Sequence, residues 1–266
     1  MRIKAAVFDI DGTLVPRGRG VPSPATARAL RALSQSGVAV IIATGRARYA
    51  AEPVLGGVCP DYYVAANGCD ITDAAGHSLW SSRMTAQEMC ALVEFCRESR
   101  LPLEFVFSDA YYAYVGYDVL AQRYGAFGAD HSLARVLRNG EEQTRHLQDM
   151  PFSACAAMEA GDVRRFTERY GHFGLRFLAF AEGWYDILRA DADKAVGVSK
   201  LLKQLGLVWA ETAAFGDGGN DAGLLRAAGL GVAMANGSPE LRALADLVAP
   251  AADEDGVARV VEQYLL

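Results

Sequence analysis

Residues 4–13, KAAVFDIDGT, decide the fold of this chain. Their apolar, partly β-branched and aromatic start predicts a buried strand that ends at two carboxylates. Because side chains alternate along a strand, Asp9 and Asp11 project to the same side, while Ile10 points away. Two neighbouring acids repel each other unless a cation or a shared proton lies between them. Taken alone, the pair is equally compatible with an acidic turn and with a functional site.

The composition restricts the classes of protein to consider. With 266 residues, 52% hydrophobic and 22% charged, the chain is globular and forms one large or two modest domains. A formal net charge of −6 argues against nucleic acid as a partner. No apolar run reaches the roughly 18–20 residues of a membrane span, so no membrane partner is expected. Without a leader before the first strand or a CxxC pair among its five cysteines, we expect a cytoplasmic protein with reduced thiols.

Strands and helices alternate at both ends of the chain. Apolar strands are expected at 38–43, 62–66, 212–215 and 230–234, with helices between them, which predicts an α/β fold with a Rossmann-like parallel sheet. A β-hairpin is expected over 67–82. In residues 83–186 strands and helices do not alternate in this way; several strands follow one another, with two or three helices among them. We therefore expect a core of residues 1–82 and 187–266 with an inserted α+β domain of residues 83–186.

Four polar clusters begin where predicted core strands end. They are Asp9 with Asp11, residues 44–46, residues 67–68 and residues 217–221. The carboxyl ends of parallel strands share one edge of the sheet, where ligands bind. If the first strand lies between the 38–43 and 212–215 strands, Asp9, Asp11 and Asp217 converge there. Three carboxylates with few other ligands favour Mg²⁺ that also binds a phosphate oxygen.

Two further elements suit a phosphate group. Thr44, Gly45 and Arg46 lie at a strand-to-helix junction, where free N–H groups and a hydroxyl can bind phosphate oxygens. A simple helix cap is the alternative for Thr44. Lys194 begins a helix at the exit of the insertion, where it would offset phosphate charge opposite the metal. A solvated surface lysine is the alternative, and Lys200, placed on the outer helix face, is the rival cation.

These motifs resemble those of a known superfamily. DIDGT at 9–13, Thr44 after a strand, Lys194, and GDGGND at 216–221 are similar in type and order to the four motifs of the haloacid dehalogenase superfamily. Asn67-Gly68, GVAMANG at 231–237 and DGVA at 255–258 extend the resemblance to the Cof-type phosphatases, which carry a large α/β cap of the C2B type between the second and third motifs. The resemblance covers the core, and the insertion matches only in position and size.

The resemblance implies roles for the acids. Asp9 would be the nucleophile that forms an aspartyl-phosphate, and Asp11 would act first as acid and then as base. Mg²⁺ would be held by the carboxylates of Asp9 and Asp217 and by the backbone carbonyl of Asp11.

It also implies roles for the other polar residues. Thr44 and Lys194 would hold the phosphoryl oxygens, and Lys194 would neutralise Asp9. Asn220 would contact phosphate or a metal-bound water, and Asp221 would orient its neighbours.

The expected function is therefore an Mg²⁺-dependent phosphatase of small phosphorylated metabolites, such as sugar phosphates or phosphorylated cofactors, acting as a monomer or homodimer. The alternatives are a phosphomutase of the phosphomannomutase type and a non-catalytic phosphometabolite-binding protein. Substrate choice is expected to lie in the insertion, although its tyrosines are better suited to strand packing. The candidates there are Glu104, Asp109, Tyr111, Tyr112, Tyr114, Arg123, His131 and Arg176.

Overall fold

The structure, a computed structural model, describes residues 2–126 and 132–266. The chain divides into two compact units: a core unit, residues 2–81 and 193–266, and an inserted unit, residues 82–192. The second boundary differs from the expected one at 187. It lies at 193 because strand β11 (Trp184–Leu188) pairs with strands of the insertion and belongs to that sheet.

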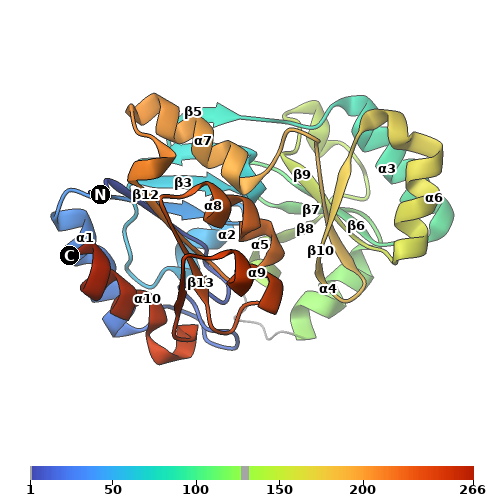
Figure 1. The fold of residues 1–266 in the computed structure, drawn as a ribbon. Coiled ribbons are helices and arrows are strands. Elements are labelled where there is room, and N and C mark those ends of the chain that lie inside the picture. The colour runs from blue at the N-terminus through green and yellow to red at the C-terminus, as the bar shows by residue number, and fades with distance from the viewer. Residues whose placement is uncertain (1, 127–131) are drawn as a thin grey trace. The chain divides into compact units, whose positions relative to one another are not determined.

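The core unit is built on an eight-stranded sheet (Figure 1). Its strands are β1 (Ala5–Phe8), β2 (Ala39–Ala43), β3 (Tyr62–Ala65), β4 (Asp70–Asp73), β5 (Ser78–Ser81), β12 (Thr212–Gly216), β13 (Leu230–Met234) and β14 (Leu247–Ala249). The order is β14-β13-β12-β1-β2-β3-β4-β5, with parallel pairing from β14 to β3 and antiparallel pairing beyond. Val7 lies opposite Ala214 on one side and Ile41 on the other. Strand β1 therefore lies between β2 and β12, the order on which the predicted meeting of the acids depended.

Helices cover both faces of the core sheet. They are α1 (Pro24–Gln35), α2 (Arg48–Ala51), α7 (Lys194–Leu205), α8 (Ala222–Ala227), α9 (Pro239–Leu244) and α10 (Gly256–Val260). On one face, Phe8 belongs to the same buried cluster as Leu30 of α1 and Val257 of α10. On the other face, Val7 belongs to the same cluster as Leu201 of α7. Burial on both faces explains why the strands are apolar throughout.

Local chemistry fixes the ends of the core helices. Helix α1 starts where the Ser23 hydroxyl accepts the backbone N–H of Thr26 at 3.0 Å, with Pro24 in the first position. Helix α2, which lies between β2 and β3, is short because it passes into a 3₁₀ turn at Glu52–Val54 that contains Pro53. Proline has no N–H to continue the α-helical hydrogen bonds.

The inserted unit has a six-stranded sheet of its own. Its strands are β6 (Leu103–Val106), β7 (Tyr111–Val115), β8 (Leu137–Asn139), β9 (Ser153–Ala157), β10 (Arg176–Ala181) and β11, in the order β10-β11-β9-β6-β7-β8. Its helices are α3 (Ala86–Ser99), α4 (Tyr117–Ala126), α5 (Ser132–Val136) and α6 (Ala160–Tyr170). Phe95 of α3 and Phe166 of α6 meet edge to face, with ring centroids 5.3 Å apart, in a cluster over one sheet face. The expected α/β core with an α+β insertion is confirmed.

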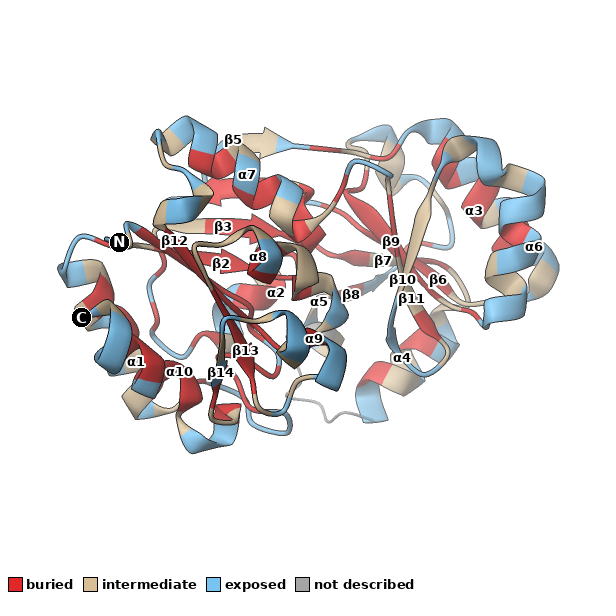
Figure 2. Ribbon diagram, viewed as in Figure 1, coloured by how far each residue is buried: buried red, intermediate tan, exposed pale blue. Residues whose placement is uncertain are grey.

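Burial follows these layers. Figure 2 shows buried residues along the central strands and exposed residues on the outer sides of the helices. Among the described residues, no helix combines the length and the apolar character that crossing a membrane requires.

One carboxyl group is buried inside the inserted unit. Glu104 of β6 is only 1% exposed, and the Tyr124 hydroxyl of α4 donates a hydrogen bond to its Oε1. Its Oε2 has no hydrogen-bond partner among the described residues. Burial raises the pKa of Glu104 to about 8, with the Tyr124 hydrogen bond opposing and the charge of Asp186 adding to the shift. Glu104 is therefore a neutral acid at pH 7.

We predict that this acid makes stability depend on pH. An unfolded glutamate ionises near pH 4.3, so between roughly pH 4.5 and 8 the folded chain binds one more proton than the unfolded chain. The stabilisation is full below this window and lost as the pH rises to about 8. Relative to Glu104→Gln, the wild type should lose up to about 1.4 kcal/mol of unfolding free energy per pH unit.

Denaturant unfolding from pH 5 to pH 9 measures this difference. Glu182→Gln, at an exposed position of the same unit, serves as the control and should follow the wild type. A constant difference between Glu104→Gln and wild type across this range would contradict the prediction.

Candidate active site

Three buried acids meet at the carboxyl edge of the core sheet. Asp9 follows β1 and is held there by its N–H, which donates to the carbonyl of Phe215 at 3.1 Å. Asp217 and Asp221 follow β12, and the three residues are 6%, 4% and 0% exposed. One carboxylate oxygen from each lies within 4.8 Å of those of the other two. Parallel pairing of β1 with β12 therefore brings together acids that are more than 200 positions apart in the sequence.

A buried lysine lies among these acids. Lys194 Nζ lies 2.7 Å from Asp9 Oδ1 and 2.8 Å from Asp221 Oδ1, and Lys194 is 1% exposed. It begins α7, whose first turn packs against the 3₁₀ turn Ala66–Gly68. A Cβ on Gly68 would lie 2.2 Å from the Asp193 carbonyl, so this approach requires glycine.

The rival lysine lies elsewhere. The Lys200 Nζ lies 3.5 Å from the centroid of the Trp80 ring. Of the two lysines that the sequence offered, the structure therefore brings Lys194 to the acids.

Burial and charge act against each other in this cluster. Burial raises the pKa of Asp9, and the charges of Asp221 and Asp11 add to this, while Lys194 lowers it. Burial alone would lower the pKa of Lys194, but the charges of Asp221 and Asp9 outweigh it and raise that pKa. These charges favour the charged form of Lys194, and an additional cation beside Asp9 would favour the ionised form of Asp9.

The oxygens of Asp221 are already used inside the protein. Its Oδ2 accepts the N–H groups of Asp217 at 3.1 Å and Gly218 at 3.0 Å, and its Oδ1 accepts from Lys194. Asp221 is thus an orienting residue for the loop and the lysine. Asp9 and Asp217 remain as the carboxylates best placed to hold a cation.

The surroundings of Asp217 fit a hard divalent cation. A Cβ on Gly12, whose φ is +86°, would lie 2.2 Å from Asp217 Oδ2, so glycine leaves the space in front of this carboxylate. Burial raises the pKa of Asp217, with Asp221 adding to the shift. Two buried carboxylates with oxygen donors only are the kind of ligand set that Mg²⁺ takes.

Three contacts of Asp217 were not expected from the sequence. The Thr13 hydroxyl donates to Oδ1 at 3.3 Å, and Arg17 Nη2 and Asn236 Nδ2 each lie 3.4 Å from Oδ2. Asn236 also donates to the Gly12 carbonyl at 2.8 Å. Asn236 follows strand β13 at the same sheet edge. Because polar residues at the carboxyl ends of parallel strands share that edge, its position after a predicted strand could have identified it. Nothing in the sequence around Arg17 indicates its contact.

Asp11 does not join the buried acids. Its side chain is 54% exposed, and both oxygens accept from Arg46, with Nε at 2.7 Å from Oδ2 and Nη2 at 2.8 Å from Oδ1. Arg46 Nη1 also donates to the Ala50 carbonyl at 3.3 Å. The arginine expected to bind phosphate therefore forms a two-point ion pair that orients Asp11 in this structure.

The Thr44 loop is fixed by the next strand. The Asn67 N–H donates to the Thr44 carbonyl at 2.9 Å. The Thr44 hydroxyl accepts the Arg46 N–H at 3.1 Å, which is the capping contact considered as its alternative role, and its own hydrogen can still donate to an anion. Gly45 lies beside the Asn67 side chain, whose Oδ1 accepts from Asn220 Nδ2 at 3.2 Å. Thr44 and Asn220 thus each contact Asn67 at this edge of the sheet.

The candidates in the inserted unit have varied surroundings. Tyr112 and Tyr114 pack in the cluster under α3 and α6, as strand packing predicts. Arg123 lies over the Trp184 ring at 3.8 Å. His131 lies outside the described residues. The other candidates have contacts within the unit: Asp109 pairs with Arg145, Arg176 donates to the Ala192 carbonyl, Tyr111 is 6% exposed, and Glu104 is buried.

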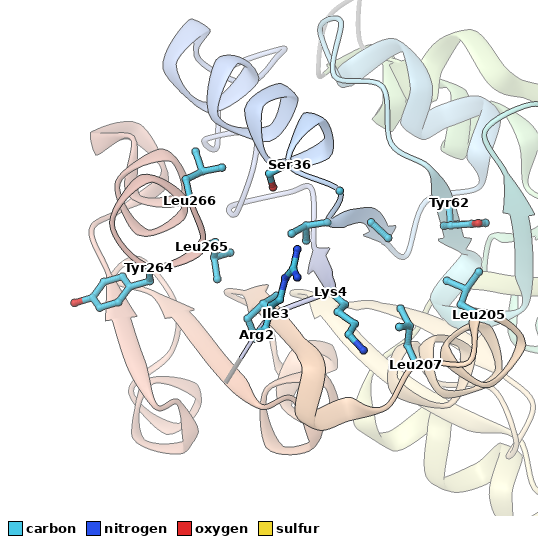
Figure 3. A pocket seen from close by; sticks show the side chains of 13 residues that line it. Arg2, Ile3, Lys4, Ser36, Tyr62, Leu205, Leu207, Tyr264, Leu265 and Leu266 are labelled. Atoms are coloured by element: carbon cyan, nitrogen blue, oxygen red, sulfur yellow. The ribbon is translucent and has the colours of Figure 1, made fainter.

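A separate hollow of about 1040 Å³ lies at the amino edge of the core sheet (Figure 3). Its lining includes Arg2, Lys4, Tyr62 and Leu266. Lys4 pairs with Glu211 at 2.5 Å. Because this is the opposite edge from the strand ends that carry the acids, the hollow is distinct from the candidate active site.

A parallel sheet with buried acids and a buried lysine at its carboxyl edge is typical of α/β enzymes. The model of the haloacid dehalogenase-like hydrolase family matches residues 6–261, and the chain belongs to this family. The predicted superfamily and hydrolase class are confirmed.

Proteins similar over their full length agree with this assignment. The putative phosphatase YkrA of Bacillus subtilis is 28% identical over 268 residues, covering 99% of this chain and 98% of YkrA. The phosphatase YwpJ of the same organism is 26% identical over 287 residues, covering 99% and 100%. The structure of BT1666 from Bacteroides thetaiotaomicron, described among phosphatases of the superfamily, has the same fold, with a TM-score of 0.87 at 24% identity over 98% and 94% of the two chains.

We predict that Lys194→Met destabilises the chain by about 3–5 kcal/mol, because it leaves two carboxylates buried without their cation. Lys200→Met removes an equal charge from the same helix and should cost about 1 kcal/mol or less, the range of a partly exposed cation–π contact. Denaturant unfolding in EDTA measures both. A Lys194→Met protein within 1 kcal/mol of the wild type would contradict the prediction.

Proposed function

We propose that this chain is an Mg²⁺-dependent phosphatase that hydrolyses small phosphorylated metabolites through an aspartyl-phosphate on Asp9. The observation that carries the proposal is the buried cluster in which Lys194 contacts Asp9 while a carboxylate oxygen of Asp217 lies within 4.8 Å of one from Asp9. Asp9, Asp217 and the backbone carbonyl of Asp11 would hold the metal. When bound, Mg²⁺ would neutralise phosphoryl charge and help orient the phosphate.

In the first step, a carboxylate oxygen of Asp9 attacks phosphorus and the bond from phosphorus to the ester oxygen breaks. Lys194 fixes Asp9 and offsets the charge of the phosphoryl oxygens, and the Thr44 hydroxyl and the Asn220 amide would bind those oxygens. Protonated Asp11 gives its proton to the leaving oxygen, which departs as an alcohol. Gly45 leaves space for the phosphoryl group beside Asn67.

In the second step, a water oxygen attacks phosphorus and its proton passes to the Asp11 carboxylate. The bond between phosphorus and Asp9 breaks, which releases inorganic phosphate and restores Asp9. Arg46 orients the carboxylate form of Asp11, which takes the proton from water, through its two hydrogen bonds. The same residue thus serves as acid and base, which requires an accessible carboxyl group, and the Asp11 side chain is half exposed.

The proposed substrates are small phosphate monoesters, such as sugar phosphates and phosphorylated cofactors. The net charge of −6 disfavours a polyanion such as nucleic acid, while one phosphate is matched by Lys194 and the metal. We also propose a cytoplasmic location, and a monomer or homodimer as the assembly.

We predict that p-nitrophenyl phosphate is hydrolysed with Mg²⁺ and is not hydrolysed in EDTA. Asp9→Asn should lower kcat by about a thousandfold or more, because an amide cannot form the acyl phosphate. Asp253→Asn, at an exposed position of the same unit, is the matched control and should retain full turnover. Release of p-nitrophenol measures all three.

Two outcomes would overturn the proposal. Turnover by Asp9→Asn would mean that another group is the nucleophile. Isomerisation of a hexose 1-phosphate that needs a bisphosphate activator, with no release of inorganic phosphate, would instead identify a phosphomutase.

A further inference from the structure

An exposed arginine contacts the acid that is proposed to bind the metal. Arg17 lies in the loop that follows β1, and its Nη2 lies 3.4 Å from Asp217 Oδ2. The Arg17 side chain is 82% exposed, whereas that of Asp217 is 2% exposed. An exposed cation therefore contacts a carboxylate that is almost completely buried.

Arg17 supplies a charge that the other partners of Asp217 lack. Thr13 and Asn236 donate neutral hydrogen bonds to this carboxylate. In the part of the chain that the structure describes, Arg17 is the one cationic side chain within 4.0 Å of the Asp217 oxygens. Its charge lowers the pKa of Asp217, against the effect of burial. Arg17 thus holds the position of a counter-ion for Asp217.

A metal ion on Asp217 would compete with this contact. Mg²⁺ carries twice the charge of a guanidinium and would bind the same carboxylate, so the two cations would repel each other at close range. Arg17 is free to leave, because its side chain is mostly in solvent. Arg46 is different, since its side chain is 13% exposed and its guanidinium is held at both Asp11 and Ala50.

We propose that Arg17 is a metal-linked anion-binding residue: it neutralises Asp217 until Mg²⁺ binds, and the released guanidinium then binds an anionic group of the ligand beside the metal. Arginine suits this task because its planar fork pairs equally well with carboxylate and phosphate oxygens. The inference rests on the metal site of the proposed function and adds to it a coupling between metal and anion.

The coupling makes two binding measurements change in opposite directions. In titration calorimetry without substrate, Arg17→Met should bind Mg²⁺ about two- to fivefold more tightly than wild type, the range expected for loss of one partly exposed ionic contact. With Mg²⁺ saturating, Arg17→Met should bind inorganic phosphate about two- to fivefold more weakly. Raising the salt concentration should reduce both differences.

The control variant removes a charge from the same loop without touching Asp217. Arg19 is exposed two residues further on, and Arg19→Met should leave both affinities at the wild-type values. Equal Mg²⁺ affinities for Arg17→Met and Arg19→Met would overturn the inference, as would an unchanged phosphate affinity in Arg17→Met. Because no turnover is measured, these results are independent of whether Asp9 proves to be the nucleophile.

Discussion

The contact of Lys194 with Asp9 and Asp221 holds together the elements that carry the candidate active site. An ammonium group and two carboxylates that are almost completely buried can persist only together, since each alone would carry an uncompensated charge. The cluster also fixes geometry. Asp221 orients the loop after β12 through two backbone N–H groups, and Lys194 ties α7 to the end of β1. One ionic cluster thus joins three of the sequence motifs: DIDGT at 9–13, Lys194 and GDGGND at 216–221.

The sequence predicted this arrangement through a rule about strands. Each predicted site residue follows an apolar strand or starts a helix beside one, and carboxyl ends of parallel strands share an edge. The rule required β1 to lie between β2 and β12, and the sheet has that order. Their position at strand ends identified Asp9 and Asp217. The place of Lys194 at the exit of the insertion selected it over Lys200, which was expected on the outer helix face. These predictions depend on the order of the strands and on the pairing of buried charges, and both follow from the pattern of apolar and charged residues in the sequence.

Contacts between side chains of distant loops could not be predicted in this way. Arg46 was assigned to phosphate because it follows Thr44, but its bond to Asp11 depends on how two loops face each other. The contact of Arg17 with Asp217 has the same origin. The insertion was harder still, because short strands without a regular period leave the pairing open. Helix α5 and strand β8 were not predicted, and the burial of Glu104 depends on the packing of α4.

The most direct test of the account is to identify the phosphorylated residue. Asp11→Asn should accumulate the intermediate from p-nitrophenyl phosphate, because this leaving group needs no acid in the first step, whereas hydrolysis of the intermediate needs the base. Borohydride reduces an acyl phosphate to an alcohol, so peptide mapping of the reduced protein should find homoserine in place of Asp9. An unmodified Asp9, or homoserine at another position, would contradict the assignment of Asp9 as the nucleophile.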